Sequence, residues 1–222
     1  MHKYILPVNN AFAENANAEN AVGAKAYLLN QFEFFGLKTP LRTSITKPYI
    51  KRTPLSDIKE IEAIVKELWM QPQREHQYFA IEFFAAHKKS WTTSSLKLME
   101  YCILHKSWWD SVDAIASEWT GPFFKLFPNK IPVIKKWNES PNMWLQRSSI
   151  MFQKAYKKDT DTALLSAYIL NCKHSKEFFI QKAIGWALRE YSKTNPDWVK
   201  QFVQNNALAP LSKREALKRI GK

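Results

Sequence analysis

The chain has 222 residues, 45% of them hydrophobic, which is enough for one large or two small domains with a sizeable core. Its 5 glycines are too few for a hairpin-rich β protein, because tight turns need residues that tolerate positive φ. The 33 Lys and Arg residues against 20 Asp and Glu residues give a net charge of +13, which favours a polyanionic partner, most often nucleic acid. The alternative is that this charge serves solubility alone.

The predicted helices follow one another from an N-terminal lead-in to the end of the chain. Residues 1–20 are expected to be a less ordered lead-in, with a frayed helix as the alternative for residues 9–20. Ser56 and Asp57 predict a helix N-terminus before the amphipathic stretch 58–68. The partner helix of that stretch covers 77–88, and the following pairs cover 96–103 with 111–119, 131–137 with 144–156, 162–170 with 178–191, and 198–203 with 213–220.

A repeat runs through these helix pairs. A small residue followed by Ile or Leu recurs at positions 80, 114, 149, 183 and 216, in steps of 34, 35, 34 and 33 residues. Ser44 and Ile45 form a looser sixth member. A period of this size indicates stacked helical repeats, so the sequence predicts one all-α domain over residues 1–222, an α-solenoid of about six helix pairs. The second helices of such pairs line the concave surface.

The repeat register selects the side chains expected on that surface. The position before each repeated small residue holds Phe79, Asp113, Ser148, Lys182 and Glu215. A carboxylate therefore occupies this position in one repeat and an ammonium in another.

Two tryptophans and an arginine accompany them. Trp109 lies four residues before Asp113 and Trp186 four residues after Lys182, so each pair shares a helix face. Arg147 is adjacent to the register position of its own repeat. These groups should converge on the groove, although Asp113 could instead cap a helix or form a structural ion pair with Arg147.

The C-terminal part of the chain is the most basic. Residues 173–222 contain 11 Lys and Arg residues and 4 acidic residues. Arg189 and Lys193, four residues apart and assigned to the helix of Trp186, are expected to bind backbone phosphates. A solvated face is the alternative for any single lysine.

The remaining patterns argue against a metal, a nucleotide cofactor and a membrane. The five histidines lack ligand spacing, and no glycine-rich phosphate loop or G-x-S-x-G motif occurs. No segment approaches the length of a membrane span, and the apolar part of residues 1–8 is too short for a signal peptide. Cys102 and Cys172 are expected to be small buried residues of a cytoplasmic protein.

Several segments together resemble one known family. They are FGLKTP at 35–40, KSWWDSVD at 106–113, MWLQR at 143–147, SKEFFIQKAIGW at 175–186, KTNPD at 193–197 and LAPLSKREA at 208–216. From about residue 27 onward, the chain resembles the AlkD-type DNA alkylation-repair glycosylases. The resemblance implies a right-handed solenoid of HEAT-like repeats with a concave basic groove. It also implies hydrolysis of the N-glycosidic bond of cationic alkylated purines, N3-alkyladenine and N7-alkylguanine, without a base-flipping pocket.

The resemblance also implies roles for individual residues. The catalytic carboxylate of the family falls on Asp113, its two groove tryptophans on Trp109 and Trp186, and its groove arginine on Arg147. The expected partner is double-stranded DNA containing alkylated bases, bound by a monomer without a cofactor.

Further DNA contacts are expected outside this set. The Gln-Thr-Pro of the family is Lys-Thr-Pro here, and Lys38 and Thr39 are expected at a phosphate. Lys182, Lys213 and Arg214 complete the predicted contacts. The alternatives are a non-catalytic protein that binds DNA structure on the same scaffold and a helical-repeat scaffold for proteins.

Overall fold

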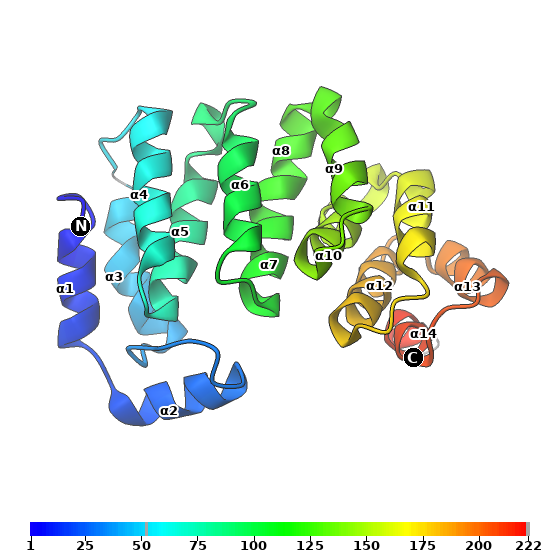
Figure 1. Ribbon diagram of the computed structural model, residues 1–222, viewed down its shortest axis with the longest axis horizontal. Helices are drawn as coiled ribbons and strands as arrows, with labels where there is room; N and C mark the ends of the chain where they lie inside the picture. Colours follow the sequence, from blue (N-terminus) through cyan, green and yellow to red (C-terminus); the bar gives the residue numbers. More distant parts are fainter. Residues whose placement is uncertain (52, 221–222) are drawn as a thin grey trace. The chain divides into compact units, whose positions relative to one another are not determined.

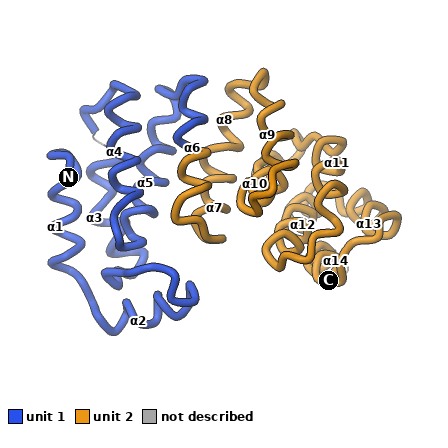
Figure 2. Tube along the Cα trace, viewed as in Figure 1, with its two compact units in different colours: residues 1–98 blue, residues 99–222 orange. Residues whose placement is uncertain are grey.

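The computed structural model describes residues 1–51 and 53–220, so Lys222 of the basic C-terminal part lies outside it. The chain divides into two compact units, residues 1–98 and residues 99–222 (Figure 2). Regular structure in the described residues is helical, apart from an isolated bridge between Glu33 and Gln73. The predicted all-α class is confirmed, whereas the single domain over residues 1–222 stays a prediction.

Unit 1 begins with two helices in the lead-in. Val8 and Phe12 of the first helix are buried, so this part of the chain packs against its neighbours. The helices of unit 1 are α1 (Leu6–Glu14), α2 (Ala18–Tyr27), α3 (Thr39–Lys51), α4 (Ile58–Met70), α5 (Arg74–Ala86) and the start of α6 (Ser95–Leu104) (Figure 1).

The pair α4–α5 forms as the sequence pattern predicts. The Asp57 side chain accepts a hydrogen bond of 2.9 Å from the backbone N–H of Lys59 and so caps α4. The side-chain amide of Gln77 on α5 donates to the carbonyl oxygens of Leu68 and Trp69, at 3.1 and 3.0 Å. These bonds supply hydrogen-bond donors to carbonyl oxygens at the C-terminal end of α4, where intrahelical donors run out.

A buried glutamate fixes the segment before α3. The Glu75 carboxylate accepts hydrogen bonds from the backbone N–H groups of Phe35, Gly36 and Leu37, at 3.1, 2.9 and 3.1 Å. Gly36 has a φ of 85°, and a Cβ there would lie 2.1 Å from the carbonyl oxygen of Asn17. Only glycine fits this conformation and this close approach, which fixes the position of Lys38 and Thr39.

Unit 2 contains the later helix pairs. Most helix bounds in this unit agree with the prediction to within three residues. The larger differences are that the predicted helix 111–119 continues through a π-helical turn and that the predicted helix 144–156 ends at Met151. The helices after α6 are α7 (Trp109–Ile115), the π-helical turn (Ala116–Thr120), α8 (Gly121–Leu126), α9 (Ile131–Asn138), α10 (Met143–Met151), α11 (Thr162–Cys172), α12 (Phe178–Tyr191), α13 (Pro196–Asn205) and α14 (Pro210–Leu217) (Figure 1).

The second helices of unit 2 pack in succession, α7 on α10, α10 on α12 and α12 on α14. Ile150, Ala183, Ile184 and Ala216 from the repeated pairs lie in one hydrophobic cluster there. A Cβ at Gly185 would lie 2.5 Å from the Cβ of Glu215, so α12 and α14 approach very closely. The repeated small residues therefore lie at helix seams, as predicted for unit 2.

The cysteines and the lengths of the helices were also predicted from the sequence. Cys102 and Cys172 are free and buried, as predicted. None of the helices in the described residues combines the length and the apolar character that crossing a bilayer requires.

Candidate active site

The centre of the candidate site is an ion pair between α7 and α10. Arg147 donates from Nε to Oδ1 of Asp113 at 2.7 Å and from Nη2 to Oδ2 at 2.8 Å. The Arg147 side chain is 1% exposed and the Asp113 side chain 12% exposed. Such a two-bond geometry fixes both side chains and uses about two of the four acceptor positions of the carboxylate. Asp113 therefore keeps acceptor capacity for another group.

Arg147 also binds the neighbouring helix α12. Its third contact is a hydrogen bond from Nη1 to the carbonyl oxygen of Phe179 on α12. The guanidinium is buried and bonded on both sides. The ion pair with Asp113 that the sequence offered as an alternative is therefore present, whereas the contact of Arg147 with a DNA phosphate stays a prediction.

The backbone around Asp113 is irregular on one side. α7 passes into a π-helical turn after Ile115, and the Ser117 hydroxyl donates to the carbonyl oxygen of Asp113 at 2.9 Å. Single π-helical turns inside helices are frequent at functional sites. Trp109 is the first residue of α7 and lies half-buried one turn before Asp113.

Trp186 on α12 is surrounded by cations. The distances to its ring centroid are 5.5 Å from Arg147 Cζ, 5.6 Å from Arg189 Cζ and 5.8 Å from Lys182 Nζ. Each lies within the range of a cation–π contact. The indole is therefore already in contact with three cations of the protein, which favours an anion beside it over a further cation.

Glu215 on α14 holds two of these cations. Its Oε1 accepts from Lys182 and its Oε2 from Arg189, both at 2.9 Å. The hydrogen bond from Lys182 is the main cause that lowers the pKa of the Glu215 carboxyl, so the group is ionised at neutral pH. The repeat register selected Glu215, but no sequence pattern indicated that it would bridge two predicted DNA contacts.

An aromatic cluster adjoins the ion pair. The ring of Trp108 lies 5.9 Å from that of Trp144 and 5.3 Å from that of Phe179, and the last two are 5.1 Å apart. The cluster supports the backbone of Phe179, whose carbonyl oxygen binds Arg147. This interaction uses a backbone atom, so the residue type at position 179 carried no signal for it.

Lys193 lies beyond the end of the helix of Trp186, on which the sequence analysis placed it, whereas its contact with DNA stays a prediction. α12 ends at Tyr191, and Lys193 donates to Glu190 at 2.7 Å and lines a separate cavity with Ala187. Lys182, Trp186 and Arg189 follow the spacing of one helix face, whereas Ala187 and Glu190 belong to another. Arg189 and Lys193 therefore serve two different surfaces.

The predicted contacts of unit 1 lie beside a cavity of that unit. Lys38 and Thr39 line a space of about 490 Å³ together with Tyr78 and Arg42. Arg42 is ion-paired with Glu82 at 2.8 Å. Lys38 and Thr39 therefore stand on a rigid, partly basic rim.

The last two predicted contacts are on α14. Lys213 is half-buried and Arg214 is exposed, and both directly precede Glu215 in this helix.

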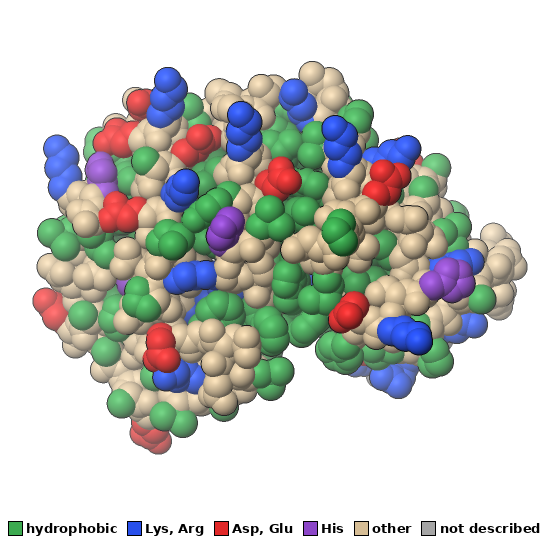
Figure 3. All heavy atoms as spheres, viewed as in Figure 1, with side chains coloured by type: hydrophobic (Ala, Val, Ile, Leu, Met, Phe, Trp, Pro, Cys, Tyr) green, Lys and Arg blue, Asp and Glu red, His purple; other side chains and the backbone are tan. Residues whose placement is uncertain are grey.

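Charge on the visible face is mixed. In Figure 3, Lys and Arg side chains alternate with Asp and Glu side chains, with hydrophobic groups between them. This face therefore shows no continuous basic patch. Among the described residues, no group of three or more His, Cys, Asp and Glu side chains could hold a metal ion.

Residues 8–220 match a family described as DNA alkylation repair enzyme. The chain belongs to this family. A solved structure described as a predicted DNA alkylation repair enzyme from Enterococcus faecalis has 32% sequence identity and a TM-score of 0.87, and the match covers 93% of this chain and 97% of that chain. The resemblance stated from the sequence is confirmed.

Two structures from Streptococcus mutans share the fold of this DNA alkylation repair family at 18% identity. AlkD2 has a TM-score of 0.64, with 91% of this chain and all of that chain covered. The protein smu.31, from strain UA159, has a TM-score of 0.62, with 82% and 96% covered. A comparison with curated proteins found no match.

Proposed function

We propose that the chain is a monofunctional DNA glycosylase that hydrolyses the N-glycosidic bond of N3-alkyladenine and N7-alkylguanine in duplex DNA. The observation that carries the proposal is the carboxylate of Asp113, held in one orientation by Arg147 and only 12% exposed. Membership of the DNA alkylation repair family supplies the class of substrate.

The chemistry needs a fixed negative charge more than a general acid. A purine alkylated at N3 or N7 carries a positive charge, and the glycosidic electron pair leaves with the base, which becomes neutral. The positive charge passes to the deoxyribose as an oxocarbenium ion, water adds to C1′, and a proton is released. A carboxylate beside C1′ stabilises this cation, more strongly in a dry site than in water.

Asp113 suits this role because its orientation is set before the substrate arrives. Arg147 occupies one acceptor position on each oxygen, at 2.7 and 2.8 Å, and leaves the others for a water molecule or the sugar. Arg147 is therefore a positioning residue in this proposal, in place of the phosphate contact expected from the sequence.

In this proposal the two tryptophans have different roles. Trp109, one helical turn from Asp113, offers an aromatic face to the developing cation, an interaction of about 0.5–2 kcal/mol. Trp186, with Lys182 and Arg189 beside it, is better suited to the sugar–phosphate backbone, because these cations attract a phosphate.

The proposal includes an open groove. It has no base-binding pocket and captures the sugar–phosphate backbone of the lesion, and tolerance of bulky adducts follows from it. In the proposed architecture, the helix pairs form a right-handed solenoid of about six HEAT-like repeats, and a basic concave groove binds the duplex to a cytoplasmic monomer.

One observation favours a second function. The ion pair with Arg147 partly neutralises Asp113, as expected for a structural bridge. A non-catalytic protein that binds DNA structure would keep such a bridge. Incubation with N-methylated duplex DNA, followed by chromatography of the released bases, separates the two functions. Release of N3-methyladenine and N7-methylguanine supports the glycosylase, whereas binding without release supports the alternative.

A further inference from the structure

A basic cavity lies beside the C-terminal end of α12, in unit 2. It encloses about 320 Å³, at the lower end of the range for small-molecule sites. We call it the lysine cavity, after Lys154, Lys157 and Lys193 in its lining. Glu190 is the single acidic residue among the lining residues, so the cavity has an excess of positive charge.

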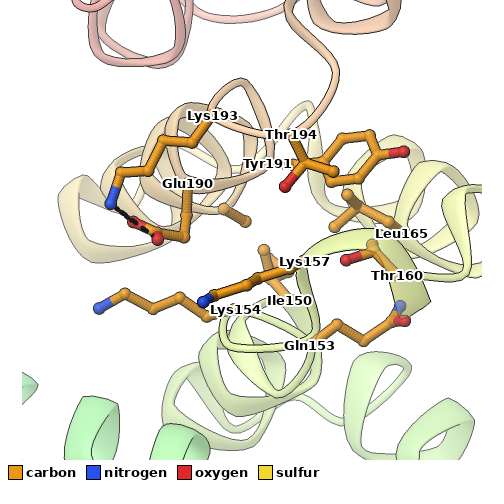
Figure 4. A pocket seen from close by; sticks show the side chains of 11 residues that line it. Ile150, Gln153, Lys154, Lys157, Thr160, Leu165, Glu190, Tyr191, Lys193 and Thr194 are labelled. Carbon is orange, nitrogen blue, oxygen red and sulfur yellow. Dashed lines mark hydrogen bonds and ion pairs between the residues drawn. The ribbon is translucent and has the colours of Figure 1, made fainter.

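The polar groups of the lysine cavity are arranged for an anion. In Figure 4 the side chains of Lys154 and Lys157 extend toward the side on which Lys193 and Glu190 form their ion pair. The hydroxyl groups of Thr160 and Thr194 lie on the other side and can donate hydrogen bonds. The cavity therefore offers donors on two sides.

The floor of the lysine cavity is apolar. Ile150, Leu165 and Ala187 line it, and all three are buried. A free inorganic ion gains nothing from such a floor, whereas a sugar attached to a phosphate can cover it. The chemistry of the cavity therefore fits a phosphate ester better than a bare anion.

The wall that carries two of the lysines is held rigidly. The buried Gln153 accepts from the backbone N–H of Asp161 at 2.8 Å and donates to its carbonyl oxygen at 3.2 Å. The Tyr156 hydroxyl donates to the carbonyl oxygen of Gly121 at 2.6 Å. These bonds fix the chain on both sides of Lys157, so the cavity is formed before a ligand binds.

Lys157 has an unfavourable backbone conformation. Its φ is 53°, in the left-handed region that glycine or asparagine usually occupies. A lysine in such a conformation is a frequent sign of a functional constraint. Here it adds a third ammonium group to a cavity that Lys154 and Lys193 also line.

We propose that the lysine cavity binds a phosphate ester, with Lys154, Lys157 and Lys193 around the phosphate and the attached sugar on the apolar floor. In the free protein the carboxylate of Glu190 is paired with one of these lysines, Lys193, at 2.6 Å. On binding, the phosphate replaces the Glu190 carboxylate as the partner of Lys193. The ligand is either a nucleotide unit of the DNA backbone or a free nucleotide. The proposal goes beyond the glycosylase function, because such a site needs no base release.

The test compares two variants that remove the same charge. Lys154→Ala with Lys157→Gly empties the cavity of two ammonium groups, and glycine at 157 keeps the left-handed backbone without strain. Lys136→Ala with Lys158→Ala removes two exposed lysines that do not line the cavity. Thermal unfolding of both variants confirms that they fold.

Two probes identify the source of the phosphate. Binding of 2′-deoxyadenosine 5′-monophosphate is measured by calorimetry, and binding of an unmodified duplex is measured over a series of salt concentrations. We expect the cavity variant to bind the nucleotide about tenfold more weakly, or to flatten the salt slope of the duplex by about 1–2 units, near 0.9 for each phosphate that is no longer neutralised. The control variant should behave as the parent in both assays.

An effect on the duplex alone assigns the cavity to the DNA backbone, and an effect on the nucleotide alone assigns it to a free ligand. Glu190→Gln should tighten binding several-fold, because it removes the competing carboxylate. If the cavity variant and the control behave alike with both probes, or Glu190→Gln leaves both affinities unchanged, the inference is wrong. Base release from methylated DNA, measured on the parent, tests the glycosylase separately, so either proposal can fail alone.

Discussion

Replacing Asp113 by Asn removes a charge that is paired with Arg147 and that, in the proposed mechanism, stabilises the transition state. Asn keeps the shape of Asp but cannot neutralise Arg147, whose side chain is 1% exposed. Breaking a buried ion pair from one side costs roughly 3–5 kcal/mol, because the remaining charge stays buried without a partner. For a chain of this size each kcal/mol lowers Tm by about 2–4 °C, so the expected loss is about 6–20 °C.

The same change should slow the chemical step. Loss of one electrostatic stabiliser typically costs a factor of roughly ten to a thousand in rate. The assay is single-turnover release of N7-methylguanine from a methylated duplex, at a temperature where circular dichroism shows the variant to be folded. Duplex binding should persist, because Asp113 is not a phosphate contact.

A double variant separates stability from catalysis. Asp113→Asn combined with Arg147→Met removes both charges, which can be nearly neutral for stability. We expect Tm to recover most of the loss while base release stays slow. If base release recovers together with Tm, Asp113 acts only through the fold. Parent rates in the single variant would refute the catalytic assignment directly.

Three further outcomes are expected. Gly185→Ala should destabilise the chain by about 1–3 kcal/mol in urea unfolding, because its Cβ would lie 2.5 Å from that of Glu215, whereas Gly23→Ala on α2, with no atom within 4 Å, should not destabilise. Because folding lowers the pKa of Glu215, its ionised carboxylate stabilises the folded state at pH values above its ordinary pKa of 4.5. This contribution disappears as the pH falls through the lowered pKa. Urea unfolding of Glu215→Gln across pH should therefore differ from the parent at neutral pH and converge with it in acid. Hypoxanthine and ethenoadenine, as neutral bases, should be released far more slowly than N7-methylguanine, and efficient release of either would reveal a base pocket or a general acid.

The helix positions were predictable from the sequence because each depends on a local pattern. Asp57 and the apolar spacing after it predict α4, and residues 178–191 predict the bounds of α12 as observed. The π-helical turn after Ile115 was not predictable, because its residues continue an ordinary helical pattern. In the lead-in, Ile5, Val8 and Phe12 have the spacing of one helix face and are buried, so an apolar pattern that the sequence analysis did not use was present there.

For the candidate site, the sequence predicted which residues belong to it but not which contacts they make. The repeat register brought Asp113, Lys182 and Glu215 to equivalent positions, but it placed Phe79 and Ser148 there too, and both are fully buried. The spacing of residues along the sequence predicts the helix and the face on which a side chain lies. It does not predict the group on the next helix with which that side chain forms a hydrogen bond. The bonds of Arg147 to Asp113 and to the Phe179 carbonyl therefore required the structure.

The net charge of +13 overstates the charge that the site offers to DNA. Lys182 and Arg189 share Glu215, Lys193 is paired with Glu190, and Arg147 is paired with Asp113. Each predicted phosphate-binding cation of α12 and its C-terminal extension therefore exchanges one anion for another when a phosphate binds. In the proposed function, this exchange lowers nonspecific affinity without removing the donors, since each carboxylate holds its cation in place through an ion pair. A phosphate in the matching position then meets cations that are already oriented, which favours the duplex geometry over an arbitrary polyanion.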